Sequence, residues 1–242
     1  MTKIDRAMFD VSQVSIYQMM ERAGEAVAEI AENYTSEDHP KVAVLVGKGN
    51  NGGGALSAAR QLANRGAELQ VILTTPVQEI GEVPATQLHI LQSLHPGTPV
   101  HDMSKVHADN LPPMPKCDII IDGLLGYNIR GVPREPISTL ITIANNAEVP
   151  TISVDMPSGL HPDTGEPAFP TILACATVTL ALPKQGFRKP AATSYLGELY
   201  LADIGIPPSL IEKNISVHNF PQRLPSIMYL VNKHSGSFSP DN

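Results

Sequence analysis

The residues of this 242-residue chain that could do chemistry gather in three polar loops, each following an apolar, β-branched run. The first loop is Gly47 to Gly53 (GKGNNGG), the second is Asp122 to Gly131 (DGLLGYNIRG), and the third is Val154 to Gly165 (VDMPSGLHPDTG). Ligands of open α/β sheets bind outside the carboxyl ends of the strands. We therefore expect the three loops to lie side by side around one site.

The first loop has the pattern of a phosphate-binding turn. Gly47, Gly49 and Gly52 satisfy G-x-G-x-x-G between an expected strand and an expected helix, which raises the pattern above chance. Glycines let the backbone approach a phosphate, and the first N–H groups of the helix attract the anion. The alternative is a plain glycine turn capped by Asn. A dehydrogenase needs an acid where the second strand ends, but that strand ends in LTTP at 73–76, which disfavours ordinary NAD-dependent hydride transfer.

The other two loops each carry a carboxylate at the end of an expected strand. Asp122 follows the isoleucines 119–121, and Asp155 follows another β-branched run. A buried carboxylate needs a ligand, an ion or amide partners, and an Asx turn is the alternative reading of Asp122. With Asn51 and Ser158, the two carboxylates make an oxygen-only set suited to a hard cation or to acid/base catalysis.

Two cations could add to this site. Arg130 in the second loop could clamp a phosphate, although a single loop arginine is more often solvated. Lys184 follows a later strand in the segment LPKQG. Two hypotheses are about equally supported: Lys184 adds a positive charge to the site, or it is an exposed lysine of a loop.

The elements that must position these loops alternate between strand and helix. The patterns predict helices at 12–33, 55–66, 84–94 and 136–147, and strands at 41–46, 69–75, 117–125, 150–154, 177–182 and 198–202, with a short one near Val100. This alternation predicts an α/β fold with a mostly parallel sheet and helices on both faces. We expect a single domain over 1–232 and a flexible tail at 233–242, which has no apolar pattern.

Composition excludes several classes of partner. The chain has 17 Lys+Arg against 24 Asp+Glu and no basic run, which argues against nucleic acid. No apolar stretch reaches the roughly 20 residues of a membrane-spanning helix, so no membrane partner is expected. The opening MTKIDRAMFD has neither signal nor transit character, and we therefore expect a cytoplasmic protein.

Several motifs, in order along the chain, resemble the YjeF N-terminal domain family. They are MMERAG at 19–24, NNGG at 50–53, the Asp122 loop with Gly126 and Arg130-Gly131, VDMPSGL at 154–160, DTG at 163–165, LPKQG at 182–186 and GELYLADIGIP at 197–207. The similarity covers about residues 5–210, and the ordered succession is far more specific than any one motif. The resemblance implies a Rossmann-like three-layer α/β/α fold, a homodimer and epimerisation of the R and S forms of hydrated NADH or NADPH.

The resemblance also implies roles for individual residues. It implies a potassium ion, whose ligands in the family match Asn51, Asp122 and Ser158. The expected substrate-binding positions, with Gly54 and Lys184 beside the family's own set, are Asn50, Asn51, Gly52, Gly53, Gly54, Gly126, Tyr127, Asn128, Ile129, Arg130, Gly131, Val132, Asp155 and Lys184. We expect Asp122 to be the acid/base group and Asp155 a substrate holder or second acid/base group, although the sequence hardly separates the two.

One position departs from the family pattern. The family reads NNGGDG where this chain has Gly54 and Ala55, so a motif carboxylate is lost. The loss is compatible with an epimerase that has altered substrate contacts, or with a nucleotide-binding or scaffold module that no longer turns substrate over. Retention of the other motif residues favours the enzyme.

Overall fold

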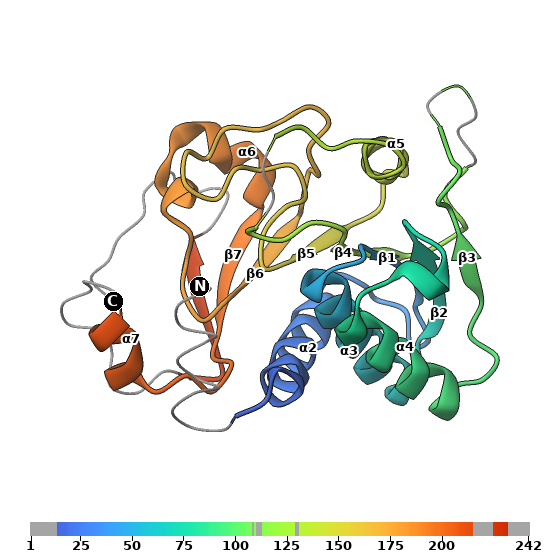
Figure 1. The fold of residues 1–242 in the computed structure, drawn as a ribbon, viewed down its shortest axis with the longest axis horizontal. Helices are drawn as coiled ribbons and strands as arrows, with labels where there is room; N and C mark the ends of the chain where they lie inside the picture. Colours follow the sequence, from blue (N-terminus) through green and yellow to red (C-terminus); the bar gives the residue numbers. More distant parts are fainter. Residues whose placement is uncertain (1–13, 108, 110–112, 129–130, 215–224, 232–242) are drawn as a thin grey trace.

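Eight strands form one sheet within the described residues, which are 14–107, 109, 113–128, 131–214 and 225–231 of the computed structural model (Figure 1). The strands are β1 (Lys41–Val46), β2 (Glu68–Leu73), β3 (Val100–Asp102), β4 (Ile119–Gly123), β5 (Thr151–Val154), β6 (Ala176–Leu180), β7 (Glu198–Ala202) and β8 (Ile227–Val231). Their order is β3-β2-β1-β4-β5-β6-β7-β8, with every pairing parallel except that of β7 with β8. The mostly parallel α/β sheet that the sequence predicts is therefore confirmed.

Helices cover both faces of the sheet (Figure 1). The longer ones are α2 (Ile16–Glu32), α3 (Asn50–Asn64) and α4 (Glu82–Leu94) on one face, and α5 (Ile137–Asn146) on the other. Strand β1 shows the division, since Val42 and Val44 pack with α2, α3 and α4, whereas Ala43 and Leu45 pack with α5. This alternation follows from the two-residue period of a strand and gives the expected three-layer α/β/α arrangement.

Among the described residues, five short helical elements lie between the strands. They are η1 (Val77–Glu79), η2 (Gln185–Arg188), η3 (Pro190–Ala192), α6 (Thr193–Leu196) and α7 (Pro208–Asn214). Three of them lie between β6 and β7, so this crossover has no long helix. No helix in the described part of the chain is both long and apolar enough to cross a bilayer.

The observed elements begin and end at specific local features. Helix α2 begins at Ile16, later than the periodicity predicts, because Ser15 and Gln18 form a reciprocal capping box with hydrogen bonds of 2.8 and 3.3 Å. Strand β6 ends at Leu180, earlier than expected, because Ala181 has a left-handed backbone with φ 62°. Strand β8 was not among the predicted strands. The expected tail at 233–242 lies outside the described residues, and the domain boundary at 232 stays a prediction.

Helix α2 reaches the site because a glycine lets it approach α3 closely. A Cβ atom at Gly24 would lie 2.3 Å from the hydroxyl oxygen of Ser57, so only glycine fits this crossing. The close approach places Met19 and Met20 of α2 near the start of α3, where both line a pocket.

Candidate functional site

The first two loops are in direct contact at the carboxyl end of the sheet. The N–H group of Gly47 donates a hydrogen bond to the carbonyl of Gly123 (3.1 Å), and a Cβ at Gly47 would lie 1.8 Å from the carbonyl oxygen of Leu124. A Cβ at Gly52 would lie 2.1 Å from the carbonyl oxygen of Gly47. Backbone packing therefore requires glycine at positions 47 and 52, where strand β1 passes directly into helix α3, but not at Gly49, where a Cβ would meet nothing within 4 Å.

The start of helix α3 is open to a ligand. Its N-cap is Gly49, no side chain caps it, and its first turn contains no acidic residue. The first N–H groups of a helix have no partner within the helix and attract anions. Gly54 is the fifth residue of α3, so the motif carboxylate that this chain lacks would stand in the second turn, beside Val154.

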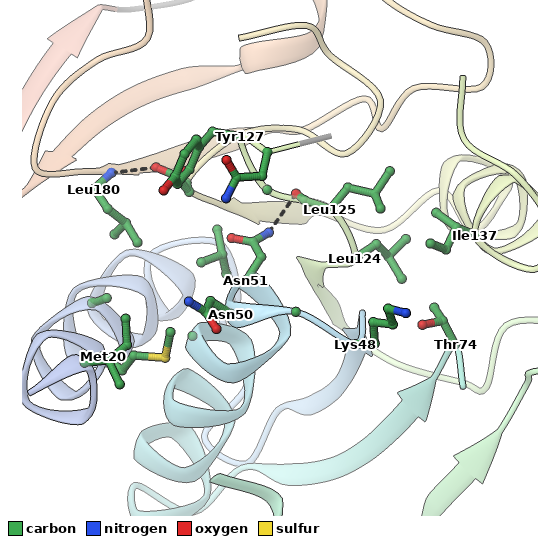
Figure 2. A pocket seen from close by; sticks show the side chains of 18 of the residues that line it. Met20, Lys48, Asn50, Asn51, Thr74, Leu124, Leu125, Tyr127, Ile137 and Leu180 are labelled. Atoms are coloured by element: carbon green, nitrogen blue, oxygen red, sulfur yellow. Dashed lines mark hydrogen bonds between the residues drawn. The ribbon is translucent and has the colours of Figure 1, made fainter. Parts of the chain in front are cut away.

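A pocket of about 680 Å³ runs along the strand ends between these loops and helix α2 (Figure 2). Seven of the expected site residues line it: Asn50, Asn51, Gly54, Gly126, Tyr127, Asn128 and Asp155. Gly131 and Val132 instead line a neighbouring cavity of about 280 Å³, which shares Leu125 and Gly126 with the first. Gly52 and Gly53 lie in α3 without lining the pocket. Ile129 and Arg130 lie outside the described residues.

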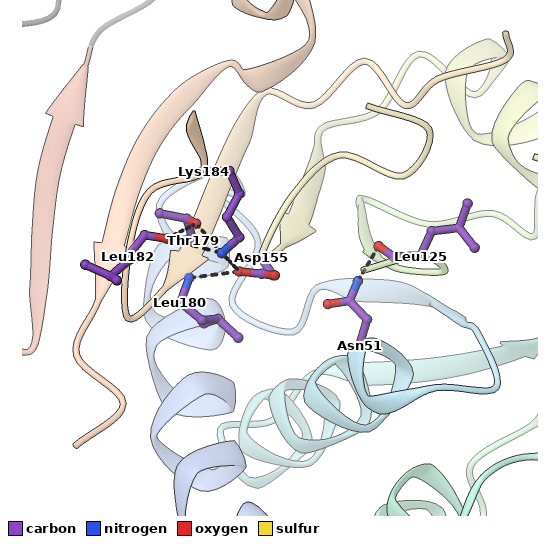
Figure 3. A network of polar contacts seen from close by, with 7 residues as sticks. All are labelled: Asn51, Leu125, Asp155, Thr179, Leu180, Leu182 and Lys184. Atoms are coloured by element: carbon purple, nitrogen blue, oxygen red, sulfur yellow. Dashed lines mark hydrogen bonds and ion pairs between the residues drawn. The ribbon is translucent and has the colours of Figure 1, made fainter. Parts of the chain in front are cut away.

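Asp155 is the carboxylate that reaches the pocket. It is the first residue after β5, its backbone is left-handed with φ 65°, and only 5% of the residue is exposed. Its Oδ1 accepts a hydrogen bond from the N–H group of Leu180 (3.1 Å) and forms an ion pair with Nζ of Lys184 (Figure 3). Non-glycine residues in this conformation are uncommon and cluster at functional sites.

Lys184 is buried and holds this carboxylate in place. Its Nζ donates to Asp155, to the hydroxyl oxygen of Thr179 (3.1 Å) and to the carbonyl oxygen of Leu182 (3.2 Å) (Figure 3). An ammonium group has three protons, so all of its donors are used. The reading of Lys184 as an exposed loop lysine is therefore wrong, because only 8% of the residue is exposed.

Asp122 lies beneath the pocket and is completely buried. It stands inside β4, paired in register with Leu45 on one side and Ser153 on the other. Its oxygens accept hydrogen bonds from the hydroxyl groups of Ser158 (2.6 Å) and Ser153 (2.9 Å) and from the N–H groups of Ser158 (2.9 Å) and Leu124 (3.2 Å). Burial raises the pKa of Asp122, and these hydrogen bonds oppose the rise because they favour the ionised form.

The three residues expected to bind potassium converge on Leu125. Asn51 Nδ2 donates to the carbonyl oxygen of Leu125 (2.8 Å) (Figure 2). The N–H group of Leu125 donates to Ser158 Oγ (2.9 Å), and the Ser158 hydroxyl in turn donates to Asp122. Oxygen atoms and a single carboxylate are the donors that a hard monovalent cation takes. The donor set fits such an ion, provided that the Ser158 hydroxyl turns its proton away from Asp122.

The structure distinguishes the roles of Asp122 and Asp155, which the sequence left nearly equivalent. The expectation that Asp122 is the acid/base group does not fit this arrangement, because its side chain is 0% exposed and does not line the pocket. Asp155 does line the pocket and is held in a fixed orientation. Any group that exchanges a proton with a ligand here must reach it, so Asp155 is the candidate.

Sequence reasoning missed several residues that line the pocket. Helix α2 contributes Ile16, Met19, Met20 and Ala23, and Lys48 and Thr75 are among the other positions. The MMERAG motif on α2 was a usable signal for the first group. Lys48 lies within the glycine-rich loop and Thr75 just after β2, so their place at the strand ends could have been read from the topology alone.

Comparisons with known proteins agree on one family. A family model described as YjeF-related protein N-terminus matches residues 16–186. The NAD(P)H-hydrate epimerase of Dehalogenimonas lykanthroporepellens is 37% identical over 212 residues, which cover 87% of this chain and 81% of that protein. The bifunctional NAD(P)H-hydrate repair enzyme Nnr of Salinibacter ruber is 33% identical over 88% of this chain, and the chain spans only 41% of its length.

A solved structure shows the same fold. The crystal structure of yeast ynu0 (YNL200c) superposes with a TM-score of 0.74 and covers 95% of this chain and 96% of the yeast chain, at 24% sequence identity. At this identity the likeness concerns the arrangement of strands and helices.

Proposed function

Because the chain belongs to the YjeF-related protein N-terminus family, we propose that it is an epimerase that interconverts the R and S forms of hydrated NADH or NADPH. The observation that carries the proposal is the oriented carboxylate of Asp155 in the wall of a pocket beside an uncapped helix N-terminus. The helix start suits the phosphates of a dinucleotide, and the carboxylate suits proton transfer.

Asp155 has one carboxylate oxygen in position for a substrate. Among the described residues, the donors to this side chain reach Oδ1, which leaves Oδ2 for a ligand. Apolar residues of α2 and β6, among them Met20 and Leu180, line the same end of the pocket. They provide a surface against which the partly saturated nicotinamide ring can pack.

The reaction needs only one group that gives and recovers a proton. In the hydrate, carbon 6 of the nicotinamide ring carries a hydroxyl group and is bonded to the ring nitrogen. The step begins when Oδ2 of the ion-paired Asp155 has taken up a proton from solvent. Asp155 donates this proton to the hydroxyl, the C–O bond breaks, and the nitrogen lone pair forms a double bond to carbon 6 as water leaves. Water then adds to the other face, the C–N double bond returns its electron pair to nitrogen, and the carboxylate takes back the proton. The configuration at carbon 6 is inverted and no redox partner is consumed.

Lys184 acts as a positioning residue in this scheme. Its three protons are engaged by Asp155, Thr179 and Leu182, so it has no proton directed to the substrate. Its charge keeps Oδ1 in place and thereby fixes the direction in which Oδ2 points.

We further propose that Asn51, Asp122, Ser158 and the carbonyl of Leu125 hold a potassium ion. The ion's charge would offset the buried Asp122 carboxylate and fix the loops after β4 and β5. The homodimer rests on the resemblance to the family, and both it and the cytoplasmic location stay predictions that light scattering and cell fractionation can test.

The test is the rate of R to S interconversion with purified protein in potassium buffer, measured by chiral chromatography against a blank without protein. We expect a rate well above the blank, and its loss in Asp155→Asn. Asp163→Asn is the matched control, because it makes the same change at an exposed position of the same loop.

A melting temperature for each variant separates loss of chemistry from loss of fold. A folded natural protein that binds nucleotide but gives only the blank rate would support the alternative, a nucleotide-binding or scaffold module. The absence of the family's motif carboxylate at Gly54 is the observation that keeps this alternative open.

A further inference from the structure

The two ends of the pocket carry different chemistry (Figure 2). Met20 and Leu180 lie at one end, close to Asp155, whereas Lys48 and Thr74 lie together at the other. A dinucleotide also has two different ends, and the proposed reaction places the nicotinamide at the Asp155 end. The Lys48 end must then take the adenosine half.

Lys48 stands at a fixed point of the backbone with its side chain in solvent. The N–H group of Gly81 donates to the carbonyl oxygen of Lys48 (2.8 Å), and the neighbouring Gly47 lies against Leu124. The side chain of Lys48 is exposed, and no salt bridge joins it to an acidic residue within the described part of the chain. Its charge is therefore available to an anion in the pocket.

Thr75 supplies a second polar group without a partner. Its hydroxyl oxygen is buried and has no hydrogen-bond partner among the described residues. Thr75 itself lines the pocket, so rotation about χ1 is needed to bring this hydroxyl to a ligand there. Buried polar atoms in folded proteins are nearly always paired, and an unpaired one calls for a ligand or water. The adjacent Thr74 is already engaged, since its hydroxyl donates to the carbonyl oxygen of Val46 (3.3 Å).

The strand order indicates which part of the adenosine binds at the Lys48 end of the pocket. In dinucleotide-binding sheets, an acid at the end of the second strand binds the 2′-hydroxyl of the adenosine ribose, and a basic residue there accommodates a 2′-phosphate instead. Strand β2 pairs with β1 and is followed by Thr74 and Thr75 with no acid, and Lys48 lies beside it. Glu135 also lines the pocket, but its Oε2 accepts from Thr139 (2.9 Å) and lies 3.4 Å from Nδ1 of His107.

We propose that Lys48 and the Thr75 hydroxyl bind the 2′-phosphate of hydrated NADPH, and that the protein therefore prefers this substrate over hydrated NADH. The inference rests on the proposed function for the identity of the substrate. The 2′-phosphate is the one group that distinguishes the two hydrates, so a site for it sets the preference directly.

The first test measures kcat/KM on both hydrates for the natural protein, Lys48→Met, Lys48→Arg and a control, Lys116→Met. Lys116 is exposed and precedes β4, at the amino end of the strands, opposite the pocket. Loss of a charge-assisted contact with phosphate should lower the NADPH-hydrate to NADH-hydrate ratio about 10- to 100-fold in Lys48→Met. Lys48→Arg and Lys116→Met should keep the natural ratio. An equal kcat/KM for the two hydrates, or a ratio that Lys48→Met leaves unchanged, overturns the inference.

The second test needs no turnover. Calorimetry should show that adenosine 2′,5′-bisphosphate binds the natural protein more tightly than AMP, and that Lys48→Met and Thr75→Val each reduce this difference. If binding meets this expectation but the protein has no epimerase activity, the proposed function is wrong and the 2′-phosphate site is supported. If the protein is an active epimerase but binds adenosine 2′,5′-bisphosphate and AMP equally well, only the proposed 2′-phosphate site is contradicted.

Discussion

The loops after β4 and β5 place two aspartates one strand apart, yet in opposite environments. Asp122 lies within β4 and is surrounded by hydroxyl and N–H donors, whereas Asp155 lies just after β5, where the chain turns with a positive φ. Asp122 lies one residue before the last residue of its strand and Asp155 one residue after the last residue of its own. This difference of two positions decides which carboxylate is enclosed by neighbouring strands and which reaches the pocket. An aspartate that follows an apolar run in the sequence can therefore be either buried or exposed to a pocket. Its position relative to the last residue of the strand decides between the two.

The two carboxylates also differ in what holds them. Asp155 is paired with the ammonium group of Lys184, while Asp122 depends on neutral donors, chiefly Ser153 and Ser158. Removing one partner from a buried ion pair leaves an uncompensated charge, whereas removing one neutral hydrogen bond costs less. The two loops should therefore respond differently to substitution.

The largest effect on stability should follow Lys184→Met. It leaves the buried carboxylate of Asp155 unpaired, which we expect to destabilise the fold by about 3–5 kcal/mol. The double variant Asp155→Asn with Lys184→Met should recover much of this loss, as denaturant titration can measure. If the double variant is no more stable than Lys184→Met alone, the contribution of the Asp155–Lys184 pair to stability does not come from its charges.

Asp122→Asn should have a smaller effect on stability. An amide cannot accept all four of the hydrogen bonds that the carboxylate accepts, and we expect a loss of about 1–3 kcal/mol. Epimerisation should remain measurable in the folded fraction, because Asp122 does not line the pocket. A folded Asp122→Asn variant with no activity would return the catalytic role to Asp122.

Potassium should stabilise the Asp122 loop and leave the Asp155 pair unaffected. At ten times its dissociation constant, the ion should raise the free energy of unfolding by about 1.4 kcal/mol in the natural protein, and by much less in Asp122→Asn. Melting temperatures in potassium and in N-methylglucamine chloride of equal ionic strength measure this. Equal stabilisation of both forms would remove Asp122 from the ion site.

The smallest effect should come from adding a carboxylate beside Asp155. A Cβ at Gly54 would lie 3.2 Å from Cγ1 of Val154, so the gain in helix propensity from replacing glycine is offset by crowding. We expect Gly54→Asp to change stability by no more than about 1 kcal/mol and to lower KM about five-fold. Gly54→Ala separates the effect of space from that of charge, and a KM that both variants change equally would contradict a polar contact at this position.

The sequence predicted most of the architecture because its signals are local. Strand β1 is a buried β-branched run followed by glycines that must pack against Leu124, and both features are visible in the letters. The separation of Asp122 from Asp155 was not predictable, since it depends on the exact residue at which each strand ends. The burial of Lys184 was equally hidden, because its partners Thr179 and Leu182 meet it only after Ala181 reverses the chain.

The most direct test of the account compares Asp155→Asn with Asp122→Asn in one assay of R to S interconversion, each rate divided by the folded fraction. We expect Asp155→Asn to lose about 10²- to 10⁴-fold in rate, the usual contribution of a general acid or base, while Asp122→Asn keeps most of the natural rate. A folded Asp155→Asn variant at the natural rate, with Asp122→Asn inactive, would contradict this expectation.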